Sequence, residues 1–265
     1  MREHFTFNVE GAQCHATLDD GPKPVGLLIV TGGNEIRSGA FAGQAHIAAH
    51  IAAKGYPVLR FDRRGVGDSE GENAEFHSAS PDIAAALAAF KARKPELRAV
   101  AGFGICDGAA ALMLAQGAQC SALVLANPWT FDDDSGDAMP AEAIRERYAA
   151  KLKNPSEWKR LLSGGVNLRK LAGGLKAARN TAPPPPSNLL ESLKAGIAGF
   201  AGDILFLAAK RDRTGAAFLS AWGEDERIAV STTADHAFSD PADQDWLVQH
   251  LLSTLDEQAR QLDMG

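Results

Sequence analysis

The sequence of 265 residues is 45% hydrophobic, enough to bury one sizeable core, and its formal net charge is −6. This acidic balance argues against a nucleic-acid backbone or an anionic membrane surface as a partner. The first residues lack the apolar core of a signal peptide, and no apolar run approaches the roughly 20 residues of a membrane span. We therefore expect a single α/β domain, residues 1–265, with no membrane span and a cytoplasmic location. The oligomeric state is left open.

Alternating strand and helix patterns fill most of the chain. The first two predicted strands, 5–9 and 13–18, alternate polar and apolar residues, which is typical of antiparallel strands at a sheet edge. The next, Val25–Val30, is an uninterrupted apolar run that suits a strand buried on both faces of a parallel sheet. Further strands are predicted at 56–61, 99–103, 121–126, 204–208 and 227–231, and helices at 40–54, 81–91, 109–116 and 243–262. This order predicts an α/β fold with a mainly parallel, eight-stranded sheet and helices on both faces.

Between residues 130 and 200 the alternation of strands and helices stops. The segment begins with an acidic loop, contains helical patterns at 141–153 and 155–162, and ends in four prolines at 183–186, which cannot be helical. We interpret 130–200 as a helical insertion within the domain that covers a pocket as a lid. A plain surface excursion is the alternative interpretation.

A candidate nucleophile follows the predicted strand 99–103. Cys106 lies between Gly104 and Gly108, and a helix is predicted to begin directly after them. This is the glycine–x–nucleophile–x–glycine elbow, in which a side chain at either glycine position would collide with the tight backbone. A free cysteine is usually a small core residue. Here the two glycines and the preceding strand favour a nucleophilic role for Cys106.

Cysteine at this position attacks as a thiolate, and the positive end of a helix and a nearby histidine both stabilise that form. Asp107 either disfavours the thiolate or points away and caps the helix, and the sequence leaves this sign open. Cys14 and Cys120 lack the glycine frame and are expected in the core. Because the three cysteines have no CxxC spacing, we expect no disulfide framework and no metal site. We also expect no cofactor, since the glycine loops match neither the Walker nor the dinucleotide-binding pattern.

The base and the acid follow from chain order, because hydrolases with this elbow place the acid and then the histidine after the nucleophile. Of the seven histidines only His236 and His250 come late enough, and His236 is favoured because it lies in the loop after the last predicted strand. Asp212, which follows the seventh predicted strand, is the predicted acid that orients His236. Asp203 and Asp235 are less well placed, since one begins that strand and the other adjoins the histidine.

The predicted oxyanion hole consists of two backbone N–H groups. One belongs to Asp107, the residue after the nucleophile, and the other comes from the glycine loop after Val25–Val30. Gly33 is the first choice for this second donor and Asn34 is the second choice. Losing one such donor typically costs about 3 kcal/mol of activation free energy.

The turn at 62–71 resembles the Asp-x-Arg-Gly-x-Gly-x-Ser turn of the α/β-hydrolases. Together with the elbow, the glycine loop, Asp212 and His236, it gives a resemblance to that superfamily over nearly the whole chain, which implies the α/β-hydrolase fold. A narrower resemblance is to the exosortase A system-associated hydrolases of type 1, whose members occur beside exopolysaccharide and PEP-CTERM sorting genes. It is carried by residues 104–108, 127–129 and 158–163. The elbow cysteine is also similar to that of dienelactone hydrolases.

Three functions are compatible with these patterns. The first is hydrolysis of an ester or thioester of a small-molecule acyl substrate through an acyl-cysteine, which the chain order of Cys106, Asp212 and His236 favours. The second is acyl transfer from the same site, possible in exopolysaccharide or PEP-CTERM-linked metabolism, where an acceptor hydroxyl replaces water. The third is a non-catalytic binding protein, because a fold does not fix a function.

Overall fold

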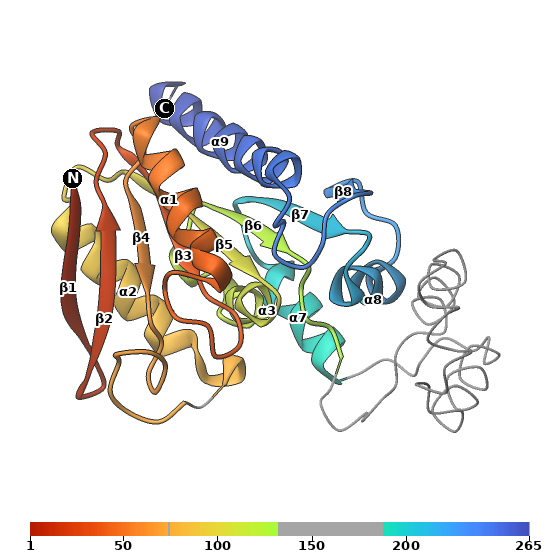
Figure 1. The fold of residues 1–265 in the computed structure, drawn as a ribbon, viewed down its shortest axis with the longest axis horizontal. Helices are drawn as coiled ribbons and strands as arrows, with labels where there is room; N and C mark the ends of the chain where they lie inside the picture. The colour runs from red at the N-terminus through yellow and green to blue at the C-terminus, as the bar shows by residue number, and fades with distance from the viewer. Residues whose placement is uncertain (74, 132–187, 265) are drawn as a thin grey trace, which may run out of the picture.

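The computed structural model describes residues 1–73, 75–131 and 188–264, which form one eight-stranded sheet with helices on both faces (Figure 1). The strand order is β1-β2-β4-β3-β5-β6-β7-β8. β2 pairs antiparallel with β1 and β4, and the other neighbouring strands pair in parallel. The predicted fold, a mainly parallel eight-stranded α/β-hydrolase sheet, is therefore confirmed. The strands are β1 (Arg2–Val9), β2 (Ala12–Asp19), β3 (Val25–Val30), β4 (Val58–Phe61), β5 (Ala99–Ile105), β6 (Ala122–Ala126), β7 (Asp203–Ala209) and β8 (Ile228–Ser231).

The helices divide the hydrophobic core into two layers, one on each face of the sheet (Figure 1). All six residues of β3 are buried, and they alternate between the layers: Leu27 and Ile29 belong to one, Leu28 and Val30 to the other. This double burial explains why the strand is apolar throughout. Helices α1 (Gly43–Ala53) and α9 (Pro241–Met264) cover one face, and α2 (Ser80–Arg93), α3 (Asp107–Leu114), α7 (Asn188–Ala198) and α8 (Arg213–Trp222) cover the other.

Two features of the fold differ from the sequence prediction. β2 lies inside the sheet rather than at its edge, and its buried Asp19 is accommodated there because it accepts a hydrogen bond from the buried Arg60 of β4 at 2.9 Å. Neither α7 nor α8 was among the predicted helices. α8 begins directly after Asp212, whose carboxylate accepts the Gly215 N–H at 2.9 Å and so caps the helix.

The predicted lid, 130–200, is described only at its ends, because 132–187 lie outside the described residues. At its C-terminal end, α7 packs against α3 and places Leu193 in the core. A Cβ atom on Gly196 would overlap the backbone of Met113, so the missing side chain allows this close helix contact. None of the described helices is long and apolar enough to cross a membrane.

Candidate active site

The carboxyl ends of the parallel strands meet at one edge of the sheet, and the predicted site residues gather there. Cys106 forms the turn between β5 and α3 with φ 60° and ψ −125°, a backbone conformation that is strained for a residue with a side chain. Its N–H donates to the carbonyl of Ala126 at 2.9 Å, and its carbonyl accepts the Trp129 N–H at 3.2 Å. The end of β6 therefore holds both peptide groups of Cys106 in the strained turn.

The two elbow glycines are required by backbone contacts. A Cβ atom on Gly104 would lie 2.6 Å from the backbone nitrogen of Ala109, and a Cβ atom on Gly108 would lie 3.0 Å from the carbonyl carbon of Thr31. Both distances are at or below the closest approach of real Cβ atoms. The missing side chains thus bring the start of α3 against β5 and against the loop after β3, as the sequence predicted.

His236 and Asp212 lie within hydrogen-bond distance of each other, with 2.9 Å between His236 Nδ1 and Asp212 Oδ2. The Asp212 hydrogen bond and a second one with the Cys106 thiol raise the pKa of His236 to about 10. Burial would raise the pKa of Asp212, but the hydrogen bond and charge of His236 outweigh it and lower that pKa below its usual value. The structure therefore places His236 between the predicted acid, to which it is hydrogen-bonded, and the predicted nucleophile, with which it interacts electrostatically.

The alternative acids and the alternative histidine lie elsewhere. Asp235 accepts the backbone N–H groups of Ala237 and Ser239 at 3.2 and 2.9 Å and so closes its own loop. His250 Nδ1 lies 2.8 Å from the carbonyl of Trp246, one turn earlier in α9. Neither residue is placed to serve Cys106.

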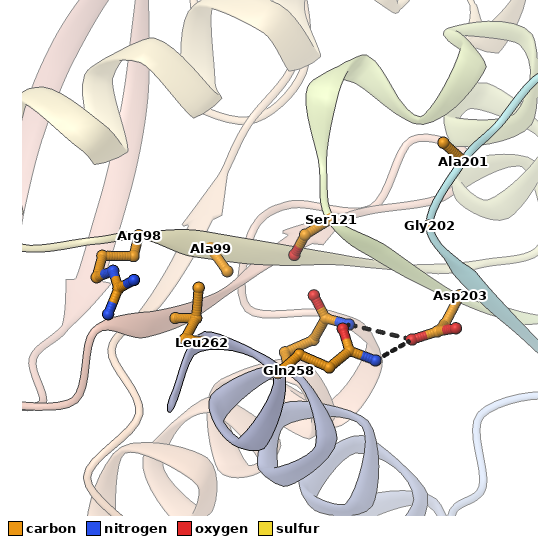
Figure 2. A pocket seen from close by; sticks show the side chains of 9 residues that line it. Arg98, Ala99, Ser121, Ala201, Gly202, Asp203, Gln258 and Leu262 are labelled. Carbon is orange, nitrogen blue, oxygen red and sulfur yellow. Dashed lines mark hydrogen bonds between the residues drawn. The ribbon is translucent and has the colours of Figure 1, made fainter. Parts of the chain in front are cut away.

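Asp203 lies at the opposite edge of the sheet, beside a cavity of about 400 Å³ (Figure 2). It accepts hydrogen bonds from Gln258 and Gln261 of α9 at 3.2 and 3.1 Å. Its carboxylate thus links the start of β7 to α9, far from the elbow. Within the described residues no three His, Cys, Asp or Glu side chains gather as metal ligands.

The predicted oxyanion donor Gly33 lies beside the elbow, with φ 55°, but its N–H donates to the carboxylate of Asp107. A Cβ atom on Gly32 would lie 2.5 Å from Asp107 Oδ1, so this carboxylate occupies space that only a glycine leaves open. The side chain of Asn34, the second choice, accepts a hydrogen bond from the Asn73 amide at 2.6 Å. One of the two predicted donors is thus occupied by the protein's own side chain.

Arg63, which was not among the predicted site residues, lies near both partners of this hydrogen bond. Its Nη2 donates to the Gly33 carbonyl at 2.5 Å and lies 3.9 Å from Asp107 Oδ2. Burial raises the pKa of the Asp107 carboxyl, and the Arg63 charge only partly opposes that rise. The one signal in the sequence that could have indicated Arg63 is its position two residues after β4, at the carboxyl edge of the parallel strands.

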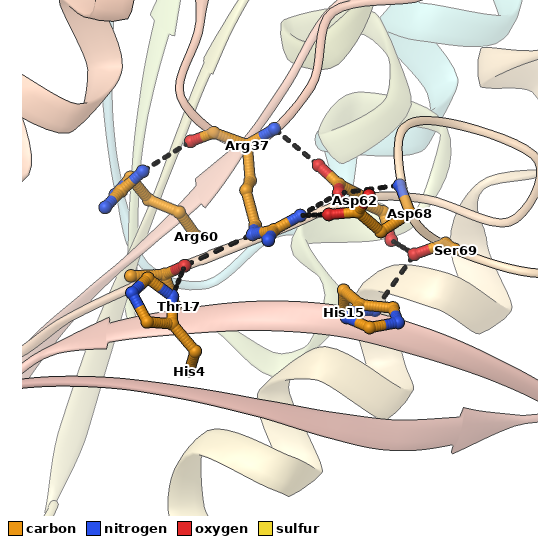
Figure 3. Close-up of polar contacts among 8 residues, drawn as sticks. All are labelled: His4, His15, Thr17, Arg37, Arg60, Asp62, Asp68 and Ser69. Carbon is orange, nitrogen blue, oxygen red and sulfur yellow. Dashed lines mark hydrogen bonds and ion pairs between the residues drawn. The ribbon is translucent and has the colours of Figure 1, made fainter.

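A buried carboxylate, that of Asp62, also holds the loop after β3 (Figure 3). Asp62 is fully buried and accepts hydrogen bonds from the backbone N–H of Arg37, at 2.5 Å, and from the Arg37 guanidinium. Arg60 donates to the Arg37 carbonyl at 2.7 Å. These bonds fix the far end of the loop that carries Gly33.

Asn127 joins the ends of two strands to the histidine loop. It is fully buried with φ 45°, its Oδ1 accepts the Ala209 N–H at 2.7 Å, and its Nδ2 donates to the His236 carbonyl at 3.4 Å. Ala209 ends β7 three residues before Asp212. Asn127 therefore helps to set the distance between the segments that carry Asp212 and His236.

A family model described as serine aminopeptidase, S33, matches residues 22–174, which is more than half of the chain. The matched segment includes the glycine loop, the 62–71 turn and the elbow. A search of curated proteins found no match.

Solved structures resemble the chain over nearly its whole length. An esterase from Pyrococcus furiosus is 15% identical with a TM-score of 0.62, covering 97% of this chain and 91% of that one. Est1E from Butyrivibrio proteoclasticus, solved with ferulic acid, is 12% identical with a TM-score of 0.56, covering 98% and 99%. Proline iminopeptidase from Mycobacterium smegmatis is 15% identical with a TM-score of 0.57, covering 95% and 98%. At these identities the likeness shows the fold.

Proposed function

We infer the function from the family, because the chain belongs to the hydrolases described as serine aminopeptidase, S33. The family description specifies serine, whereas the elbow of this chain carries Cys106. We propose a hydrolase that cleaves an ester or thioester through an acyl-cysteine on Cys106. The observation that supports this most directly is the position of His236, which is hydrogen-bonded to Asp212 and interacts with the strained Cys106.

In the proposed acylation step the Cys106 sulfur attacks the acyl carbon as a thiolate. Because the pKa of His236 is raised to about 10, the imidazole holds a proton at neutral pH and can pass it to the leaving alcohol or thiol. Asp212 keeps the ring oriented and stabilises its positive charge. The backbone N–H groups of Asp107 and Gly33 are the proposed donors to the developing oxyanion.

In the proposed second step His236, now neutral, takes a proton from a water molecule, and the resulting hydroxide cleaves the acyl-cysteine. The His236 side chain is 44% exposed, so water has access to the ring from solvent.

The proposal also includes a narrower family, because the elbow glycines and the 127–129 segment resemble exosortase-associated hydrolases. It further includes a small-molecule acyl substrate and a cytoplasmic location.

The test uses the variants Cys106→Ala and Cys106→Ser with p-nitrophenyl acetate and acetyl-CoA. We expect Cys106→Ala to lose at least about 10³-fold in kcat, and intact-protein mass spectrometry to detect one acetyl group on the wild type but not on this variant. Cys106→Ser is the matched control, because it keeps a nucleophile of similar size. Turnover that survives in Cys106→Ala contradicts the proposal. Free acetate as the main product in the presence of an added sugar alcohol separates hydrolysis from acyl transfer.

A further inference from the structure

The oxyanion hole of this protein contains a carboxylate of its own. Asp107 Oδ1 accepts the Gly33 N–H, the same hydrogen bond that the carbonyl oxygen of a bound acyl group would accept. Gly32 leaves the necessary space, since a Cβ atom there would lie 2.5 Å from Oδ1. The carboxylate and the substrate oxygen therefore compete for one donor, and catalysis requires Asp107 to have a second position.

Arg63 offers that second position. Its side chain is 4% exposed, and among the described residues its Nε and Nη1 have no hydrogen-bond partner. Buried guanidinium donors without a partner are unusual, because each forgoes a hydrogen bond that it would make in water. The third nitrogen, Nη2, already lies 3.9 Å from Asp107 Oδ2. A guanidinium with two N–H groups lacking a partner, next to a carboxylate, is arranged to form an ion pair in which it donates two hydrogen bonds to the two carboxylate oxygens.

We propose that the Asp107 carboxylate blocks the oxyanion hole in the resting protein and shifts onto Arg63 when an acyl substrate binds. This inference rests on the proposed function. The shift frees the Gly33 N–H for the substrate oxygen and moves a negative charge away from the oxyanion that develops there. Arg63 is then a positioning residue, because it acts through Asp107 and does not touch the reacting atoms.

The electrostatics of the resting position agree with a carboxylate that can leave. Burial raises the pKa of Asp107, which means that its charged form is disfavoured where it lies, and Arg63 compensates only in part from 3.9 Å. A closer contact with Arg63 strengthens the attraction, since the energy of two charges varies inversely with their separation. The backbone N–H of Asp107 stays in place during a side-chain rotation, so its own role as a donor is kept.

The test is a double-mutant cycle with Asp107→Ala and Arg63→Met, measured as kcat/KM for p-nitrophenyl acetate. Asp107→Ala keeps the backbone donor and removes the competing carboxylate, so we expect kcat/KM to rise about fivefold, the equivalent of one ordinary hydrogen bond. Arg63→Met leaves the displaced carboxylate without a partner and should lower kcat/KM at least about tenfold. In the Asp107→Ala background the loss caused by Arg63→Met should shrink to less than about threefold.

A second readout does not depend on turnover. Acetaldehyde adds reversibly to the Cys106 sulfur, and the resulting hemithioacetal oxygen, which takes up the thiol proton, lies in the same hole. Its dissociation constant should fall about fivefold in Asp107→Ala. Asp107→Asn keeps the side-chain shape without the charge, so its acetaldehyde dissociation constant should lie between those of wild type and Asp107→Ala. Arg63→Lys should recover part of the kcat/KM that Arg63→Met loses. Melting temperatures establish that each variant is folded.

Equal losses from Arg63→Met in both backgrounds would overturn the inference, because Arg63 would then only support the Gly33 loop through its carbonyl. Weaker acetaldehyde binding in Asp107→Ala would overturn it as well. These failures differ from failure of the proposed function, which is indicated by turnover in Cys106→Ala. An inactive Cys106→Ala protein together with an uncoupled cycle rejects the inference alone.

Discussion

The substitution Gly104→Ala tests whether the elbow geometry controls both stability and catalysis. The new Cβ atom would lie 2.6 Å from three backbone atoms, the nitrogen of Ala109 and the carbonyl carbon and oxygen of Gly108. Real Cβ atoms are essentially never closer than 3.0 Å to such neighbours, so the start of α3 must move by at least about 0.4 Å. Cys106 lies within this turn and moves with it, whereas His236 is held separately by Asp212 and Asn127.

The expected magnitudes follow from that displacement. Overpacking of this kind costs about 1–3 kcal/mol of unfolding free energy, and each kcal/mol lowers the melting temperature by about 2–4 °C in a chain of this size. A misplaced nucleophile lowers kcat/KM on the order of 10²-fold. Calorimetry and hydrolysis of p-nitrophenyl acetate, with rates taken well below the melting temperature, measure the two effects separately.

Gly43→Ala is the matched control for this substitution. Gly43 begins α1 with helical φ and ψ, and a Cβ atom there would meet no atom within 4 Å. This variant should keep full activity and gain about 0.5–1 kcal/mol of stability. Wild-type activity and stability in Gly104→Ala would refute the overlap argument. A destabilised Gly104→Ala protein with wild-type kcat/KM would show that the turn is not coupled to catalysis.

Three further predictions concern the proposed triad and the thiols. Asp212→Asn should lower kcat/KM on the order of 10²–10⁴-fold and lower the pKa of His236 seen by proton NMR; an unchanged titration contradicts the pairing. Because the pKa of His236 is raised in the folded state, wild type should have a larger free energy of unfolding than His236→Gln. This difference should be fully present below pH 6.5, the ordinary histidine pKa, and should disappear as the pH rises through about 10. A melting-temperature difference that persists above that pH argues against this assignment. Iodoacetamide at neutral pH should label the half-buried Cys106 before Cys14 and Cys120. Burial raises the thiol pKa of Cys14 and raises that of Cys120 to about 12. Peptide mass spectrometry that finds another order of labelling contradicts this prediction.

The sequence was sufficient for features that arise from local pattern and chain order. The apolar run of β3 requires burial on both faces, and the structure provides two core layers around it. The spacing of Gly104, Cys106 and Gly108 requires a tight turn between strand and helix, which the structure has. Asp212 and His236 could be paired because both follow strands of one parallel sheet, whose carboxyl ends share an edge.

Features that depend on contacts between distant segments were not predictable. The sequence left open where the Asp107 side chain points, and its position depends on Gly33, 74 residues earlier, and on Arg63. The Asp19–Arg60 ion pair, which compensates the charge of a buried aspartate in the interior strand β2, is formed across 41 residues. Helix α8 escaped prediction because its cap is Asp212, a residue that was assigned only to the site.

Asp212 and Asp107, two partly buried aspartates at this edge of the sheet, differ in what they can do because they differ in their partners. Asp212 accepts hydrogen bonds from His236 and from the Gly215 N–H, and these outweigh burial, so its pKa is lowered and its charge is stabilised where it lies. For Asp107, burial outweighs the Arg63 charge and the backbone hydrogen bonds from Gly33, Gly108 and Asp107 itself, so its pKa is raised. A carboxylate whose charge is well compensated stays in place and orients its partner. A carboxylate whose charge is poorly compensated is stabilised by moving closer to a cation that has donors without a partner, as Arg63 has. Substrate binding should therefore displace Asp107 and leave Asp212 where it is.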